Sequence, residues 1–315
     1  MDNSEKKALP KYSVVIPVYN SEATLNELCR RLASVFESNG LLYEIILVND
    51  ASSDKSWQVM KDLKKNYRFL KIIQLMRNFG QHNALICGFH YVTGNYVITM
   101  DDDLQNPPEE IPKMISKIND GYDVVIGAQI VKQHSIFKNF SSFIIRYLNE
   151  RIFNKPKELR LSSFRILTRA VTDEIKTLKT PYPYISGQML SITRNIVNVD
   201  VIHDKRKFGK STYTFRKLLN LAFNLVINYS SLPLRVLTLI GISVSAVSFC
   251  MGMFFIAKKV VVGIPVSGWT SVVVLLSFFN GLLLIIISII GEYLGRIINE
   301  VSNRQQFVVR EKLID

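Results

Sequence analysis

The sequence predicts an α/β domain built on a mainly parallel sheet, followed by two membrane-spanning helices. Short runs rich in β-branched residues alternate with helix-like patterns over the first 130 residues. This alternation is typical of a parallel sheet that helices cover on both faces. Two later stretches, Val236–Ala257 and Val260–Gly291, contain no charged residue. Each exceeds the roughly 20 residues that a helix needs to cross the hydrocarbon layer, and buried helices of soluble proteins rarely run this long without charge.

The expected strands and helices alternate in order along the domain. We expect strands at 12–18, 43–49, 69–75, 95–100 and 122–127, with helices near 22–38, 54–66, 80–92 and 108–119. Ligands of such sheets bind beyond the carboxyl ends of the strands. Polar residues follow three of the expected strands there, namely Tyr19 and Asn20, Asp50, and Asp101 to Asp103. The pattern therefore predicts a nucleotide site at this edge, although the sequence has neither a P-loop nor a GxGxxG motif.

Charge and cysteine content narrow the class of protein. The net charge is +13, and the basic residues concentrate beside the two apolar stretches. Anionic lipid headgroups and phosphate substrates explain this placement better than a nucleic acid does. Cys29, Cys87 and Cys250 show no metal-binding or redox spacing. We expect no cleavable signal peptide, and the basic flanks predict that both termini lie in the cytoplasm.

Three segments have the spacing of amphipathic helices: 136–148, 216–228 and 294–301. Each could be an ordinary helix packed on the core, but the last two flank the apolar stretches, which favours helices lying in the membrane interface. The predicted boundaries are a cytoplasmic domain 1–212, an amphipathic interfacial helix 213–232, a transmembrane helix 233–257, an external loop 258–268, a second transmembrane helix 269–291, and a cytoplasmic interfacial helix and tail 292–315.

Three adjacent carboxylates lie at the end of the fourth expected strand, in MDDDLQNPPEE (100–110). Because alternate side chains of an extended chain share a face, Asp101 and Asp103 can converge while Asp102 points elsewhere. Hard carboxylate oxygens suit Mg²⁺ or Mn²⁺, which typically bridge protein carboxylates and substrate phosphates. A solvated acidic turn, or a charge cluster at a helix N-terminus, is the alternative interpretation.

Four segments, in this order and spacing, resemble the family 2 glycosyltransferases with the GT-A fold: VVIPVYN (14–20), LVNDASSD (47–54), RNFGQHNALICGF (77–89) and MDDDLQNPPEE (100–110). More narrowly, the chain resembles the polyprenol-phosphate glycosyltransferases, which include the dolichol-phosphate mannose synthases and bacterial members that act on undecaprenyl phosphate. The similarity continues through RKFGKSTYTFRKL (206–218), SLPLR (231–235) and GEYLGRI (291–297). It covers nearly the whole chain.

The resemblance implies an inverting, metal-dependent enzyme. It would transfer a sugar from a nucleotide diphosphate-sugar to undecaprenyl phosphate, giving a lipid-linked monophosphate sugar for modification of cell-envelope glycans. The bacterial-type architecture favours a UDP-sugar over a GDP-sugar. The identity of the sugar stays open.

The resemblance also implies a role for individual side chains. Pro17, Tyr19 and Asn20 would line the nucleobase pocket, Asp50 would hold the base or ribose, and Asp102 would lie by the ribose and diphosphate. Asp101, Asp103 and Gln105 would surround Mg²⁺ or Mn²⁺. Arg206 and Lys210 would close over the diphosphate and complete the catalytic set with Asp101 and Asp103. The alternatives are that Tyr19 only packs and that the basic pair only faces lipid headgroups.

Four positions depart from the pattern of the family. Relatives commonly show Asp-Ala-Asp where this chain has Asp101 to Asp103, and some have Glu at Ser21, Arg at Gln129 and Asp at Ser163. These departures leave the contacts to the sugar and to the acceptor phosphate open, with Lys132, Arg146 and Arg165 as candidate substitutes. We expect the sugar preference to depend on the segment from Ser163 to Arg165.

The predicted protein is a multi-pass protein of the inner (cytoplasmic) membrane whose catalytic domain faces the cytoplasm. Its expected partners are the donor, the polyprenyl phosphate and membrane lipid, without nucleic acid, and a homo-oligomer is compatible with the resemblance. Two other functions stay open. A transferase acting on a saccharide hydroxyl would need an acidic base near its acceptor. A non-catalytic membrane scaffold or nucleotide-sugar sensor would not need the intact acidic triplet.

Overall fold

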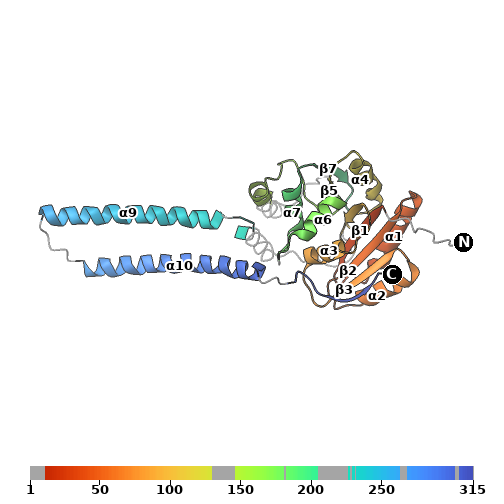
Figure 1. Ribbon diagram of the computed structural model, residues 1–315, viewed down its shortest axis with the longest axis horizontal. Coiled ribbons are helices and arrows are strands. Elements are labelled where there is room, and N and C mark those ends of the chain that lie inside the picture. The colour runs from red at the N-terminus through yellow and green to blue at the C-terminus, as the bar shows by residue number, and fades with distance from the viewer. Residues whose placement is uncertain are drawn as a thin grey trace. The chain divides into compact units, whose positions relative to one another are not determined.

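The computed structural model describes residues 11–129, 146–180, 182–204, 226–227, 229–230, 232–262, 268–301 and 305–314. The chain forms two compact units. The first consists of Met1–Tyr213 together with Gln305–Asp315, and the second of Thr214–Arg304. The first unit contains the sheet and its covering helices, and the second contains two long helices (Figure 1).

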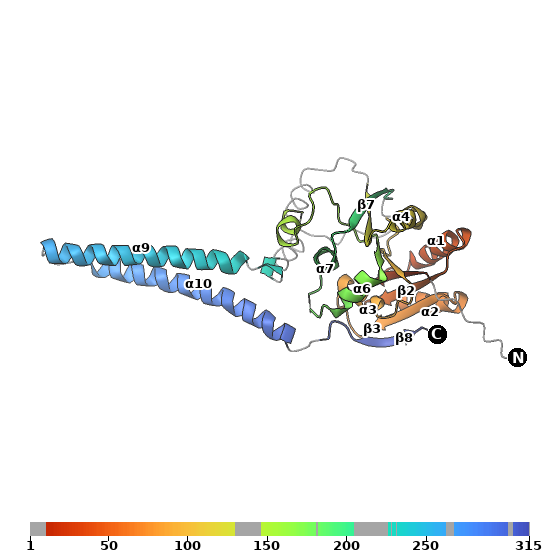
Figure 2. The ribbon, with the colours of Figure 1, turned by 45° about the horizontal axis from the view of Figure 1, so that its top comes forward.

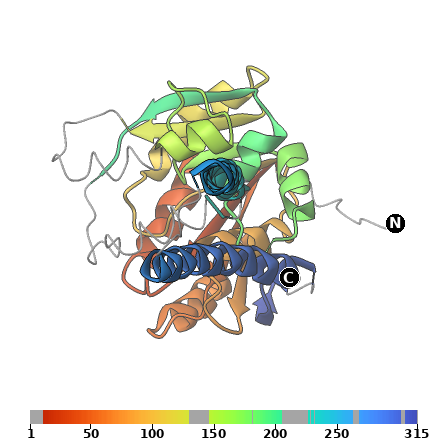
Figure 3. The same cartoon turned by 90° about the vertical axis from the view of Figure 1, so that its left-hand side faces the viewer.

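The first unit is built on an eight-stranded sheet with the order β7-β5-β6-β4-β1-β2-β3-β8. The strands are β1 Tyr12–Val18, β2 Tyr43–Asn49, β3 Leu70–Leu75, β4 Tyr96–Thr99, β5 Val124–Gln129, β6 Arg165–Thr168, β7 Ile196–Val201 and β8 Val309–Leu313. Parallel pairing joins β4, β1, β2 and β3 in series, and also joins β5 to β7. β6 is antiparallel to β4 and β5. The predicted mainly parallel sheet and its five expected strands are confirmed. Figure 3 shows the amino-terminal elements (red to orange) and the elements from β5 to β7 (yellow to green) on opposite sides of this unit.

Helices cover both faces of the sheet. They are α1 Leu25–Ser38, α2 Ser56–Asn66, α3 Gln81–Phe89, the 3₁₀ helix η1 Pro108–Glu110, α4 Ile111–Ile118, α6 Arg169–Thr177 and α7 Ile185–Ile192. Alternate residues of a strand point to opposite faces. Accordingly, Val14 and Ile16 join the core cluster that includes α1, while Val15 contacts α3. A Cβ atom at Gly88 of α3 would lie 2.3 Å from Cγ1 of Val15, so this close approach requires glycine.

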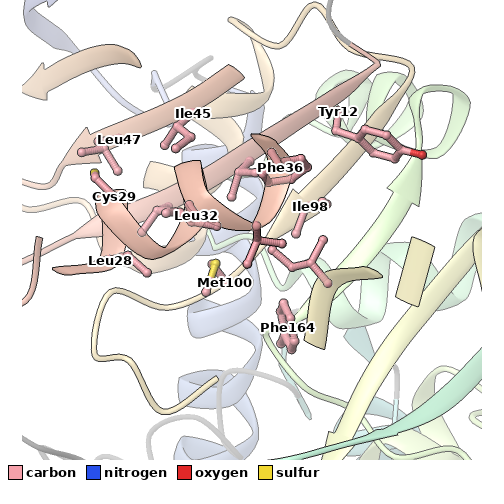
Figure 4. Close-up of a cluster of buried hydrophobic side chains, with 14 of the residues drawn as sticks. Tyr12, Leu28, Cys29, Leu32, Phe36, Ile45, Leu47, Ile98, Met100 and Phe164 are labelled. Atoms are coloured by element: carbon pink, nitrogen blue, oxygen red, sulfur yellow. The ribbon is translucent and has the colours of Figure 1, made fainter. Parts of the chain in front are cut away.

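The main core lies between α1 and the sheet. Leu28, Leu32 and Phe36 of α1 are fully buried against Ile45 and Ile98 of the strands (Figure 4). Their spacing of four residues places them on one face of the helix, which is the face that the hydrophobic effect drives onto the sheet. The core fixes the strands whose carboxyl ends carry the polar residues.

The segment 292–315, predicted as an interfacial helix and tail, contains the end of α10 (Trp269–Val301) and a further strand. The helix continues to Val301, and Val309–Leu313 then adds β8 antiparallel to β3 (Figure 2). The added strand pairs backbone groups that would otherwise form an open edge of the sheet. Gln306 extends the contact, because its side-chain amide donates hydrogen bonds to the carbonyls of Leu178 (3.0 Å) and Thr180 (2.9 Å).

The second unit contains α9 Leu232–Val262 and α10 Trp269–Val301. Within α10, Phe278–Gly295 is long and apolar enough to cross a membrane, whereas the apolar stretch found in α9, Pro233–Val244, is shorter. One candidate span therefore occurs among the described residues, so the two predicted spans are not confirmed. The predicted amphipathic segments 136–148 and 216–228 lie largely outside the described residues.

Candidate functional site

Three loops meet at the carboxyl ends of the central strands. Each contains one residue with a positive φ angle, a conformation that residues other than glycine rarely adopt. Asn20 follows β1 with φ 55°, Ala51 follows β2 with φ 55°, and Leu104 follows β4 with φ 60°. Such conformations cost energy and cluster at functional sites. The side chain of Leu104 is only 2% exposed, so its burial in the core holds the strained acidic turn in place.

The loops after β1 and β2 are joined by hydrogen bonds that involve Asn20. Its Oδ1 accepts from the backbone N–H of Ser53 at 2.8 Å, and its own N–H donates to Oγ of Ser52 at 3.0 Å. Asn20 therefore fastens two loops together, and Pro17 is buried within β1. Asn20 and Tyr19 are both exposed at this edge, and the side chain of Tyr19 is 51% exposed. Tyr19 therefore presents an aromatic ring to a ligand.

Asp50 lies directly after β2 and is almost fully buried. It is 3% exposed, and its two carboxylate oxygens accept hydrogen bonds from the backbone N–H groups of Phe79 (2.7 Å) and Gly80 (2.8 Å). Burial raises the pKa of Asp50, and the two N–H donors offset part of that rise. Asp50 thus anchors the loop that leads into α3.

Asp101 accepts a hydrogen bond on each carboxylate oxygen. Nε2 of Gln81 donates to Oδ1 at 2.6 Å, and Oγ of Ser163 donates to Oδ2 at 2.6 Å. Burial raises the pKa of Asp101, and the charge of Asp103 raises it further, while the Ser163 hydrogen bond and the positive charge of Arg165 lower it. The two hydrogen bonds therefore hold the carboxylate in one orientation, while Asp103 and Arg165 act on its charge in opposite directions.

Asp102 turns toward the loop after β1. Its Oδ2 accepts from Oγ of Ser21 at 2.5 Å and from the backbone N–H of Tyr19 at 3.2 Å. Burial raises the pKa of Asp102 to about 6, with further contributions from the charges of Asp101 and Asp103. The three acids thus interact electrostatically, although their hydrogen-bond partners come from different elements.

Asp103 and Gln105 form the end of the acidic turn. Oδ1 of Asp103 accepts from the backbone N–H of Gln105 at 3.1 Å, and the carbonyl of Gln105 accepts from the N–H of Asp204 at 2.8 Å. Next to this contact, Nδ1 of His203 lies 3.2 Å from Oδ1 of Asn106. The chain that leaves β7 is therefore bound to the acidic turn.

The basic residues expected at the acceptor phosphate differ in position. Arg165 is only 2% exposed, and its guanidinium donates to the hydroxyls of Thr99 and Ser186, both at 3.2 Å. The guanidinium of Arg165 is therefore buried, and its positive charge acts on Asp101. Burial lowers the pKa of Arg165 to about 10. Arg146 is exposed, and Lys132, Arg206 and Lys210 lie outside the described residues.

Some residues of the site were not predicted by sequence reasoning. Gln81 and His82 begin α3, and burial lowers the pKa of His82 to about 4, which keeps its imidazole neutral. Ser21 and Ser163 were noted only as departures, and the structure shows both as donors to the acidic triplet. The only signal for them in the sequence was that each replaces an acidic residue that some members of the family have.

The acidic turn offers oxygen ligands of the kind that a divalent cation binds. Among the described residues, no group of three or more His, Cys, Asp or Glu side chains is arranged to hold a metal ion. Asp101 and Asp103 supply two carboxylates that repel one another when both are ionised, and Gln105 could add an amide oxygen. Because Mg²⁺ and Mn²⁺ sites often use one or two carboxylates and complete the shell with phosphates and water, the residues fit such an ion.

Comparison with known proteins gives consistent results over most of the chain. Residues 13–176 match the family described as Glycosyl transferase family 2. The undecaprenyl-phosphate 4-deoxy-4-formamido-L-arabinose transferase of Klebsiella pneumoniae is 34% identical over 303 residues, which is 95% of this chain and 93% of that protein. The uncharacterized glycosyltransferase YkcC of Bacillus subtilis is 32% identical over 96% of this chain and 94% of its own length.

A solved structure shares the fold. The crystal structure of glucosyl-3-phosphoglycerate synthase from Mycobacterium tuberculosis, in complex with Mn²⁺, UDP and phosphoglyceric acid, superposes with a TM-score of 0.52. The match has 16% sequence identity and covers 69% of this chain and 76% of that one. At this identity the likeness concerns the fold alone.

Proposed function

Since the chain belongs to glycosyl transferase family 2 and is a glycosyltransferase with the GT-A fold, we propose that it transfers a sugar from a UDP-sugar to undecaprenyl phosphate. The observation that carries this proposal is the likeness to an undecaprenyl-phosphate sugar transferase over 95% of the chain. The product would be a lipid-linked monophosphate sugar. The geometry of the three loops supports a place for each part of the reaction.

The donor nucleotide would bind where the loops after β1 and β2 meet. The ring of Tyr19 is 51% exposed there and offers a surface on which a base can stack. The hydrogen bonds of Asn20 to Ser52 and Ser53 make this part of the site rigid. A preformed platform lowers the entropy that binding must overcome. Pro17 and Asp50 would act here through the backbone that they hold.

Asp101, Asp103 and Gln105 would hold Mg²⁺ or Mn²⁺, and the relative that shares the fold was solved in complex with Mn²⁺ and UDP. When bound, such an ion acts as a Lewis acid on the diphosphate leaving group. Asp102, whose carboxylate is fixed by Ser21, would lie on the ribose side of the same group. In this arrangement the protein supplies orientation and the placement of negative charge.

Arg206 and Lys210 would neutralise charge on the departing diphosphate. Asp204, two positions before Arg206, donates its backbone N–H to the carbonyl of Gln105 at 2.8 Å. This contact brings the chain to the proposed metal turn just before the basic pair. The contact between Asp204 and Gln105 supports the assignment.

The acceptor chemistry needs little base catalysis. A phosphate monoester is largely ionised near neutral pH because its second pKa is about 6. Its oxygen would attack the anomeric carbon, and the sugar–diphosphate bond would break with inversion. The protein's contribution is then to position the two substrates and to stabilise the leaving group. A strong general base is therefore not required in the proposed reaction.

The membrane anchor would keep the catalytic unit beside its lipid acceptor. Phe278–Gly295 of α10 is one candidate span, and we propose that α9 supplies a second. Both termini and the sheet would then lie on the cytoplasmic side of the inner membrane. The basic residues that flank the apolar stretches agree with this orientation.

The proposal is tested by incubating membranes that contain the protein with a panel of nucleotide sugars and two acceptors. One arm supplies undecaprenyl phosphate and the other a saccharide with free hydroxyls. We expect mass spectrometry to find a new sugar-phosphate lipid with one UDP-sugar in the first arm only. Product in the saccharide arm alone would indicate a glycan-extending transferase. Nucleotide binding without product in either arm would indicate a sensor or scaffold.

A further inference from the structure

Two donors from distant parts of the sequence bind the two oxygens of one carboxylate. Gln81 reaches Asp101 across 20 positions and Ser163 reaches it across 62, each at 2.6 Å. We infer that Gln81 and Ser163 are positioning residues that hold Asp101 in the orientation a divalent cation requires. This inference rests on the metal site of the proposed function.

Hydrogen bonding by the two donors leaves Asp101 able to bind a cation. An ionised carboxylate offers about four lone-pair sites on its two oxygens, and the two donors occupy one on each. Carboxylates that bind metal ions are themselves hydrogen-bonded in most sites, and loss of such an outer partner typically costs about 10- to 100-fold in metal affinity or activity. Gln81 and Ser163 are such outer hydrogen-bond partners of Asp101.

Both donors are themselves held in place. The hydroxyl of Thr99 donates to the carbonyl of Ser163 at 2.6 Å, and the same hydroxyl accepts from Nε of Arg165 at 3.2 Å. Gln81 is the first residue of α3, directly after the two N–H groups that Asp50 binds. Asp50 thus acts on Asp101 through the start of this helix. The orientation of one acid is determined by a network that extends into the core.

The serine is the more informative of the two donors. Its hydroxyl is in hydrogen-bond contact with an acid, so Ser163→Asp would place a second carboxylate against Asp101 and remove a donor. Ser163→Asn introduces a side chain of nearly the same size as aspartate, but one that keeps an N–H donor. In the same way, Gln81→Glu keeps the shape of the side chain while it exchanges a donor for a negative charge. Comparison of these variants separates the effects of charge and hydrogen-bond donation from the effect of side-chain volume.

The experiment measures Mn²⁺ binding by the purified full-length protein in the presence of UDP, from the electron paramagnetic resonance signal of free Mn²⁺. We expect Ser163→Asp and Gln81→Glu to weaken Mn²⁺ binding about 10- to 100-fold, and Ser163→Asn to stay within a few-fold of the unmodified protein. Gln58→Glu is the matched control, since Gln58 donates to Asp62 at 3.2 Å on the exposed surface of α2. Its Mn²⁺ affinity should not change.

Asp101→Ala distinguishes a failure of the proposed metal site from a failure of the roles inferred for Gln81 and Ser163. If it abolishes Mn²⁺ binding while Ser163→Asp and Gln81→Glu bind normally, the inference is overturned and the proposed metal site stands. If Asp101→Ala itself leaves Mn²⁺ binding unchanged, both fail. Should Ser163→Asp not fold, as judged by its melting temperature, Ser163→Ala removes only the hydroxyl and should still lose Mn²⁺ affinity. Unchanged affinity in Ser163→Ala would contradict the role of the serine.

Discussion

The hydroxyl of Ser21 and the carboxylate of Asp102 are in direct contact, with Oγ donating to Oδ2 at 2.5 Å. The contact makes the two positions direct neighbours, so two carboxylates placed there would repel one another. In this chain the pair consists of one acid and one hydroxyl donor.

This relationship predicts a double-mutant effect. Ser21→Glu should lower transferase activity at least about tenfold, because it buries a second charge against Asp102 and removes a donor. The double variant Ser21→Glu with Asp102→Ala should recover most of the activity, since it restores a single acid at the contact. Initial rates of lipid-linked product give the comparison. Additive losses in the double variant would show that the two positions do not interact.

The exposed ring of Tyr19 predicts a loss of nucleotide affinity without a loss of structure. Tyr19→Ala should weaken UDP binding by about 1–3 kcal/mol, the range found when an aromatic ring that stacks on a base is removed. Tyr19→Phe keeps the ring and should bind nearly as well. The backbone N–H that donates to Asp102 is unchanged in both variants. Isothermal titration with UDP measures the difference, and equal affinity of the two variants would exclude stacking.

A buried ion pair far from the acids predicts a dependence of stability on pH. Glu44 is 4% exposed and bonds Nζ of Lys71 and Oγ of Ser13, each at 2.6 Å. Burial raises the pKa of Glu44, but these partners and the N–H of Thr93 lower it more, so the pKa lies below its usual 4.5. The stabilisation is therefore fully present above about pH 4.5 and is lost as the pH falls through the lowered pKa of the folded state.

Glu44→Gln tests this assignment through thermal unfolding in detergent. At pH 7 it should lower the free energy of unfolding by roughly 1–3 kcal/mol, because hydrogen bonds to a charged group are lost. The difference from the unmodified protein should shrink as the pH is taken below 4.5. Glu27→Gln is the control, since its pair with Arg30 is exposed and contributes little. A difference for Glu44→Gln that stays constant with pH would contradict the assignment.

The carboxyl-terminal tail predicts a local effect of one glutamine. Gln306→Ala removes the hydrogen bonds to the carbonyls of Leu178 and Thr180. The free energy of unfolding should fall by about 1–2 kcal/mol, and amide exchange in the segment from Leu178 to Tyr182 should become faster. Gln305→Ala alters the neighbouring exposed glutamine and should change neither measurement. Equal behaviour of the two variants would show that the tail contact adds no stability.

The sequence predicted the first half of the fold well because its strands are buried on both faces. Continuous apolar runs such as those of β1 and β2 can hardly form anything else between helix-like segments. The later strands carry weaker signals. β6 has only four residues, and β8 reads VREKL, in which charged residues outnumber apolar ones. β6 forms between β4 and β5, and β8 forms on the edge of β3, so both depend on strands that only the tertiary fold supplies.

The candidate site divides in a similar way. The acids of the turn after β4 and the exposed Tyr19 were predicted from their place at strand ends. The donors that orient the acids were not, because Ser163 and Ser21 meet Asp101 and Asp102 across 62 and 81 positions. The burial of Arg165 could not be predicted for a related reason. The hydroxyls that accept hydrogen bonds from its guanidinium belong to Thr99 and Ser186, which only the fold brings near.

In the proposed function, Asp103 and its neighbours hold a cation that serves transfer to a lipid phosphate. The most direct test measures lipid-linked product from undecaprenyl phosphate and the matching UDP-sugar, with the unmodified protein and with Asp103→Ala, before and after chelation of divalent metal. We predict that chelation and Asp103→Ala each abolish product, while the variant still enters the membrane in normal amount. Normal transfer by Asp103→Ala with the metal chelated would contradict the account.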